Sequence, residues 1–182
     1  MKSRLKRVIS LALMATLFVT APAFAQATTT MTDGHIAKIR TNCQAAILTL
    51  GQIHANDAPA YINRNQTYFS ISDKLMARLN SRLTLNRYDA TQLVKTASEY
   101  NSELAKFRTA YKTYDDSMST AANMDCIKEP VSFYDRVSDA RDARQAVRDI
   151  VDQLTSLINQ YQQQVQAFQA QHFSSQAGSD NS

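Results

Sequence analysis

The two residues best suited to a chemical role are Cys43 and Cys126, the only cysteines in the chain. An even pair of cysteines in an exported protein most simply forms one disulfide bond, and the alternative is two buried free thiols. A bond that closes a loop of about 80 residues stabilises the fold by about 4 kcal/mol on chain-entropy grounds. We therefore expect a structural disulfide, provided that the chain is exported.

Other residue patterns that carry chemistry are missing from the sequence. The histidines, His35, His54 and His172, have no metal-ligand partner at helical spacing, and there is no H-E-x-x-H motif. No Glu-x-x-His pair occurs, which excludes the usual di-iron site of helical bundles. There is also no Gly-rich phosphate loop and no G-x-S-x-G nucleophile motif. The sequence therefore predicts a protein that is not an enzyme and that holds no metal or cofactor.

The first 25 residues have the three parts of a secretory signal peptide. Basic residues at positions 2–7 precede an apolar run at 8–19, and an A-x-A cleavage site ends at Ala25. Four of the 20 basic residues and none of the 16 acidic residues lie in this segment, which leaves 16 of each after it. This balance removes the main support for a nucleic-acid partner or an anionic-membrane partner.

The remainder of the chain has the features expected of an exported protein outside the membrane. No apolar stretch after residue 25 is long enough to span a bilayer. We expect residues 26–32 to form a flexible leader and residues 174–182 to form a disordered tail. The sequence therefore predicts a periplasmic, extracellular or cell-surface protein whose helical domain covers residues 33–173.

Three long segments carry apolar residues at the alternating three- and four-residue spacing of a coiled-coil seam. The last segment, residues 133–172, has no Gly or Pro, and its seam is apolar or tyrosine except at Arg144 and His172. Arg144 is expected to reach solvent or to pair with an acidic residue across the bundle. The middle segment covers residues 93–121. The first segment begins at Ile36, and beyond Pro59 its seam has a seven-residue repeat of Ile62, Phe69, Met76 and Leu83.

Two all-α architectures fit these segments. In a four-helix up-and-down bundle, residues 33–57 and 59–86 fold back on each other at Pro59. In a three-helix bundle, residues 33–86 form one helix that is kinked near Pro59. Cys43 and Cys126 lie at similar distances along the chain from a turn at Arg87, so a helical hairpin brings both to the same level. We therefore predict an elongated three-helix antiparallel bundle or coiled coil.

The arrangement of cysteines and turns carries a resemblance. A cysteine lies early in a long helix, and the turn Asn86-Arg87-Tyr88-Asp89 leads into an aromatic-rich helix that ends at the second cysteine. A Pro-x-x-Phe sequence at 130–133 then opens the last helix. In these features the chain resembles uncharacterised exported all-helical, cysteine-paired coiled-coil proteins of candidate-phylum bacteria. The resemblance implies a location in the cell envelope or at the cell surface, and it implies no activity.

The pattern favours an interaction or structural role with an unidentified protein partner or a second copy of the chain. After Pro59 the seam is weak, because Asn65 and Ser72 occupy positions that a core fills with aliphatic side chains. Aromatic and arginine side chains make effective interface anchors. The candidate interaction residues are Tyr61, Arg64, Asn65, Tyr68 and Phe69. The alternative is that these side chains pack inside the bundle.

A second hypothesis is an extracytoplasmic chaperone. Residues 48–52 read Leu-Thr-Leu-Gly-Gln, which is similar to the L-T-x-x-Q motif of Spy-like helical chaperones. That family has two such motifs, and this chain has one. The resemblance implies binding to unfolded exported proteins in general rather than to one specific partner.

Overall fold

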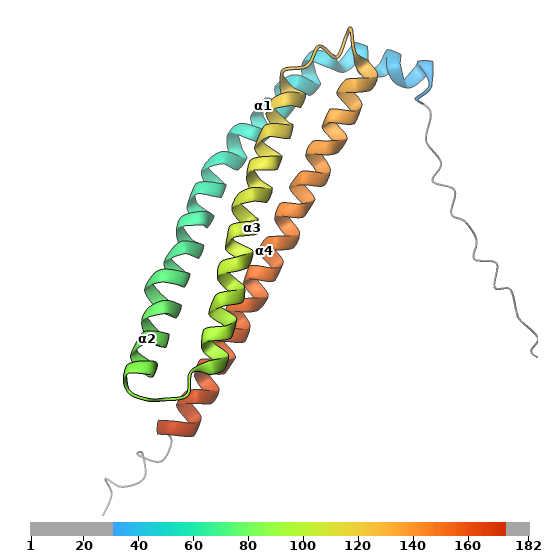
Figure 1. The fold of residues 1–182 in the computed structure, drawn as a ribbon. Helices are drawn as coiled ribbons and strands as arrows, with labels where there is room; N and C mark the ends of the chain where they lie inside the picture. The colour runs from blue at the N-terminus through green and yellow to red at the C-terminus, as the bar shows by residue number, and fades with distance from the viewer. Residues whose placement is uncertain (1–30, 174–182) are drawn as a thin grey trace, which may run out of the picture. The chain divides into compact units, whose positions relative to one another are not determined.

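The computed structural model describes residues 31–173, which are helical almost throughout and include no strand. Three segments, α1 (Asp33–Ser70), the π-helix η1 (Ile71–Ala77) and α2 (Arg78–Leu85), follow one another without a break. Helices α3 (Thr91–Ala122) and α4 (Pro130–Phe173) complete the unit (Figure 1). The all-α prediction is confirmed. The predicted signal peptide at 1–25, most of the leader at 26–32 and the tail at 174–182 lie outside the described residues.

The first helix does not fold back at Pro59, so the four-helix alternative is wrong. Pro59 lies inside α1, where it removes one backbone donor without ending the helix. Figure 1 shows that α1 is bent rather than straight. The chain reverses once between α2 and α3 and again between α3 and α4, which gives the predicted three-helix antiparallel arrangement.

The three helices do not share the core equally. Helices α3 and α4 pack along each other extensively, whereas α1 contacts mainly α3 and touches α4 little. Nine residues of α3 are buried, but only Cys43 and Tyr68 are buried in the longer α1. One side of α1 is therefore left open toward α4.

The π-helix η1 changes which face of the first helix points inward. A π-helix has more residues per turn than an α-helix, so it offsets the seam. Before η1 the core side chains are Tyr61 and Tyr68. Within η1 the core side chain is Met76, and after it, in α2, it is Leu83. The predicted repeat of Ile62 and Phe69 with Met76 and Leu83 on one face is therefore wrong, because Ile62 and Phe69 are 53% and 50% exposed.

Two tyrosine hydroxyls from α3 and α4 donate hydrogen bonds to backbone carbonyls in and next to η1. Tyr100 donates to the Tyr68 carbonyl at 3.1 Å, and Tyr161 donates to the Met76 carbonyl at 3.3 Å. These hydroxyls add hydrogen bonds to backbone carbonyls just before η1 and within it, where the regular helical ladder is displaced.

The turn between α2 and α3 ends the first helix with a left-handed residue. Arg87 has a φ of 62°, and the Tyr88 N–H donates to the Leu83 carbonyl at 3.0 Å. The Arg87 N–H donates to the Thr84 carbonyl at 3.0 Å. This pair of bonds is the Schellman motif, here with arginine at the position that usually holds glycine.

Candidate functional site

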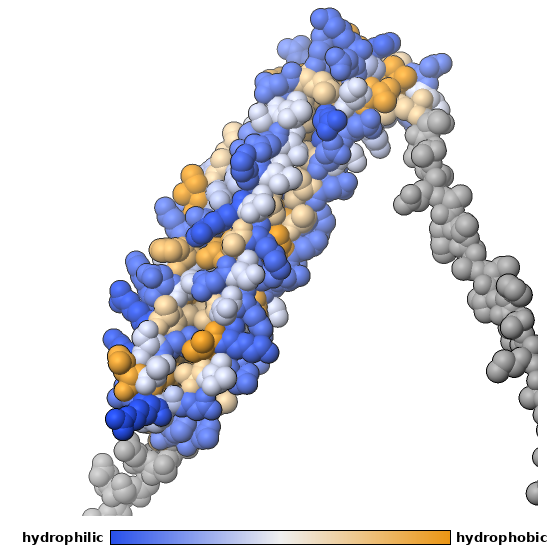
Figure 2. All heavy atoms as spheres, in the orientation of Figure 1, coloured by the Kyte–Doolittle hydropathy of each residue, from blue (hydrophilic) through white to orange (hydrophobic). Residues whose placement is uncertain are grey.

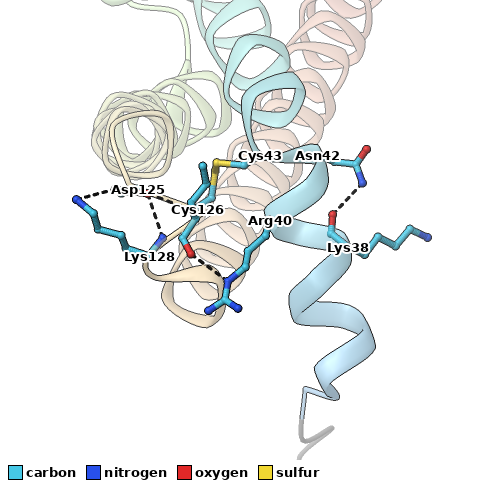
Figure 3. Close-up of a disulfide and its surroundings, with 8 residues drawn as sticks. Lys38, Arg40, Asn42, Cys43, Asp125, Cys126 and Lys128 are labelled. Atoms are coloured by element: carbon cyan, nitrogen blue, oxygen red, sulfur yellow. Dashed lines mark hydrogen bonds and ion pairs between the residues drawn. A yellow bond between two sulfur atoms is a disulfide. The ribbon is translucent and has the colours of Figure 1, made fainter.

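The disulfide lies at the end of the bundle where α3 gives way to α4. Cys43 and Cys126 have Cα atoms 5.6 Å apart and form the predicted bond, which ties α1 to the loop before α4 (Figure 3). Arg40 adds a second tie, since its Nε donates to the Ile127 carbonyl at 3.1 Å. Cys43 and Cys126 are 6% and 0% exposed and pack with Phe133, so the bond is structural.

Two of the five candidate interaction residues pack inside the bundle. Tyr61 stacks on Tyr111 with ring centroids 3.6 Å apart, and it also contacts Phe107. Tyr68 is only 9% exposed and meets the edge of Phe107. For these two tyrosines the structure matches the alternative of core packing.

Of the other three candidate residues, Arg64 and Phe69 are exposed and Asn65 is partly buried. The Asn65 side chain accepts a hydrogen bond from Arg108 Nε at 2.9 Å, so this polar seam residue ties α1 to α3. Arg64 lines a cavity near the middle of the bundle. Phe69 is half exposed on the side of α1 that faces away from the core. The five residues therefore do not form one continuous surface.

Exposed apolar residues recur every seven positions along α1. Leu48, Ile62 and Phe69 are 61%, 53% and 50% exposed, and Ala55 occupies the intervening position and is also exposed. We call these four residues the outer stripe. A seven-residue step returns to almost the same face of a helix, with a drift of about 20°. Figure 2 shows apolar side chains among polar ones along the surface of α1.

A mostly apolar cavity of about 530 Å³ lies on the open side of α1, which we call the α1/α4 cavity. Its walls include Ile39, Leu50, Ile53, Met118, Phe133 and Val137. Small side chains at Ala46 and Ala140 leave the space unfilled. Arg141 and Arg144 are its only charged lining residues.

A polar cluster closes the central end of the α1/α4 cavity. Asp57 in α1 accepts a hydrogen bond from the Tyr114 hydroxyl at 2.5 Å and pairs with Arg144 at 3.0 Å. Burial, followed by the bond to Asp57, raises the pKa of Tyr114 above its ordinary value, so its hydroxyl remains a donor at neutral pH. The sequence predicts that Arg144 either reaches solvent or pairs with an acidic residue across the bundle. The structure shows the pair, with Asp57 of α1.

A second cavity of about 420 Å³ lies beyond this cluster. Tyr61, Phe107 and Tyr111 form its aromatic wall, and Arg64 and Arg148 reach its rim. Sequence reasoning did not predict either cavity, because neither has a motif. The only sequence signals are the arginine in the seam at position 144 and the alanines near it.

The described residues contain no cluster of three or more histidine, cysteine, aspartate or glutamate side chains that could hold a metal ion. His54 Nε2 lies 2.6 Å from Asp115 Oδ1, but this pair has no third ligand beside it in that part of the chain. None of the helices within residues 31–173 combines the length and apolar character needed to cross a bilayer.

Comparison with protein-family models, curated proteins and solved structures finds no match for this chain.

Proposed function

We propose that this chain is an exported, non-enzymatic helical-bundle protein that binds another protein in the cell envelope or at the cell surface. The observation that carries the proposal is the outer stripe of Leu48, Ala55, Ile62 and Phe69. Leu48, Ile62 and Phe69 are at least half exposed, so they contribute little buried apolar area to the bundle that bears them. They suit an interaction surface.

The spacing of the outer stripe defines the partner surface that it fits. Successive members lie about 10.5 Å apart along α1, which is seven residues at the rise of an α-helix. A partner helix with its own seven-residue apolar repeat can pack along such a stripe. Phe69 is the aromatic member of the stripe, and half-exposed aromatic side chains make effective interface anchors.

Export has its own support. The N-terminal sequence has the pattern of a signal peptide, and the cysteine pair is at bonding distance, as expected in an oxidising compartment. The resemblance to exported cysteine-paired helical proteins favours the envelope or the cell surface.

Site-specific photocrosslinking in intact cells tests the proposal. A benzophenone amino acid replaces Phe69 in one variant and the exposed Ala105 of α3 in a control variant. We expect the Phe69 position to capture one dominant envelope protein that the Ala105 position does not capture. Capture of a second copy of this chain identifies a homo-oligomer. Identical products at both positions contradict the outer stripe as the binding surface.

The chaperone hypothesis predicts a different result in the same experiment. Leu48 belongs both to the chaperone-like motif and to the outer stripe, and Leu50 lines the α1/α4 cavity. A broad set of unrelated exported proteins crosslinked at Phe69 replaces the specific-partner proposal with a chaperone. Suppression of the aggregation of an unfolded client at equimolar dose then confirms that activity.

A further inference from the structure

We propose that the α1/α4 cavity binds a single-chain anionic amphiphile, such as a long-chain fatty acid. This site is separate from the outer stripe, because none of the four stripe residues lines the cavity. The inference therefore goes beyond the proposed protein-binding function and does not depend on it.

The walls of the cavity suit a hydrocarbon chain. Side chains from α1, α3 and α4 surround a space of about 530 Å³, which lies within the range of about 300–1,000 Å³ typical of ligand pockets. The described chain does not fill this space, because α1 stands away from α4 and Ala46 and Ala140 project only methyl groups into it. An apolar ligand there removes both its own surface and these walls from water.

The length of the cavity suits one acyl chain. Its α1 wall runs from Ile39 to Ile53, which is about 21 Å at the rise of an α-helix. The hydrocarbon core of a bilayer is about 30 Å thick and holds two chains end to end, so one chain spans about 15 Å. The α1 wall of the cavity is therefore long enough for one acyl chain of this span.

The charges in the cavity define the head group. The lining residues include Arg141 and Arg144 and no acidic side chain. Arg144 is already paired with Asp57. Arg141 makes none of the ion pairs found within residues 31–173, so its guanidinium is available. A guanidinium binds a carboxylate through two parallel charge-assisted hydrogen bonds, which makes a carboxylate a fitting head group.

The order of residues along α4 orients the ligand. Phe133 packs beside the disulfide at one end of the bundle, and Arg144 pairs with Asp57 nearer its middle. The acyl chain therefore points toward Phe133 and the carboxylate lies at Arg141. The Asp57, Tyr114 and Arg144 cluster closes the central end, which favours a ligand that terminates there over a partner helix that continues along the groove.

Displacement of a fluorescent fatty acid by hexadecanoate tests this site in the folded protein with its disulfide intact. We expect saturable one-to-one binding of hexadecanoate and at least tenfold weaker binding of hexadecyltrimethylammonium, which has an alkyl chain of similar length and the opposite charge. Arg141→Gln should weaken hexadecanoate binding about tenfold, as expected for losing a hydrogen bond between charged groups. Arg82→Gln, a matched change at an exposed arginine outside both cavities, should leave binding unchanged.

A second variant tests the hydrocarbon wall. Ala46→Phe should fill the cavity and abolish binding, while Ala55→Phe on the outer stripe should not affect it. Circular dichroism verifies that each variant is helical, and the exposed position of Arg141 makes Arg141→Gln informative even if Ala46→Phe fails to fold. Absence of saturable binding, equal binding of the cationic amphiphile, or unchanged binding in Arg141→Gln overturns the proposal.

Discussion

At the scale of single residues, tyrosine hydroxyls connect the helices across the core. Tyr161 in α4 is buried and donates to Asn80 Oδ1 in α2 at 2.8 Å. Asn80 in turn donates to the Leu93 carbonyl at the start of α3 at 3.4 Å. Burial raises the pKa of Tyr161 to about 12, so the hydroxyl is a neutral donor across the physiological range. A seam tyrosine thus supplies both apolar area and a specific polar contact.

Replacing Tyr161 with phenylalanine tests this contact. The change keeps the ring and removes the donor, which leaves the buried Asn80 Oδ1 without that bond. We expect the free energy of unfolding to fall by about 1–2 kcal/mol. Urea denaturation followed by circular dichroism measures the change.

Tyr134→Phe is the matched control, because Tyr134 is 51% exposed. We expect its effect to stay within about 0.5 kcal/mol, as for most surface substitutions. Equal effects of the two variants show that the Tyr161 hydroxyl bond contributes nothing to stability.

At the scale of elements, the disulfide compensates for the weak packing of α1. The first half of α1 buries Cys43 alone, whereas α3 buries residues along its whole length. The cysteines and Phe133 form a separate cluster at that end, with Ile39 and Leu50 packed against it. The first half of α1 buries few side chains against α3 and α4. The disulfide therefore holds this part of α1 in place.

Replacing both cysteines with serine measures this contribution. We expect the double variant to lose about 4 kcal/mol of unfolding free energy, because the unfolded chain regains the freedom of a loop of 83 residues. Chemical denaturation of the oxidised parent and the double variant gives the difference. The reduced parent is the control that separates loss of the bond from the effect of the serines. A difference below about 1 kcal/mol contradicts the role of the bond as a staple.

At the scale of the whole bundle, helices α3 and α4 pack extensively against each other, and α1 packs less extensively against this pair. The cluster around Tyr100, Phe107 and Leu154 joins α3 to α4, and η1 and α2 contribute Met76 and Leu83 to it. The outer stripe and the α1/α4 cavity both involve α1, which buries fewer residues than α3 or α4. The two proposed binding surfaces therefore belong to the least buried helix.

Amide hydrogen exchange tests this division of stability. Elements with few buried contacts open locally at lower free energy than the core. We expect amides in residues 33–50 to exchange faster than those in residues 93–121 in the oxidised protein. Breaking the disulfide should enlarge the difference, because the first helix then loses its tie to the loop before α4. Uniform protection of all three helices, in both states, contradicts this division.

The sequence by itself determined the helices α3 and α4, the turn near Arg87 and the pairing of Cys43 with Cys126. Sustained apolar spacing with almost no Gly or Pro leaves a long helix as the only regular structure, and the lengths on either side of the turn bring the cysteines level. These properties depend on local periodicity and chain length alone.

Only the tertiary structure decided which face of α1 is buried and where the cavities lie. The extra residue in the π-helix changes the core spacing, so the core side chains are Tyr61 and Tyr68 and then Met76 and Leu83. The hydroxyls that bond to carbonyls at this segment come from α3 and α4. Ile62 and Phe69 therefore face solvent despite their heptad spacing. The α1/α4 cavity likewise depends on how far α1 stands from α4, which no pattern within one helix specifies.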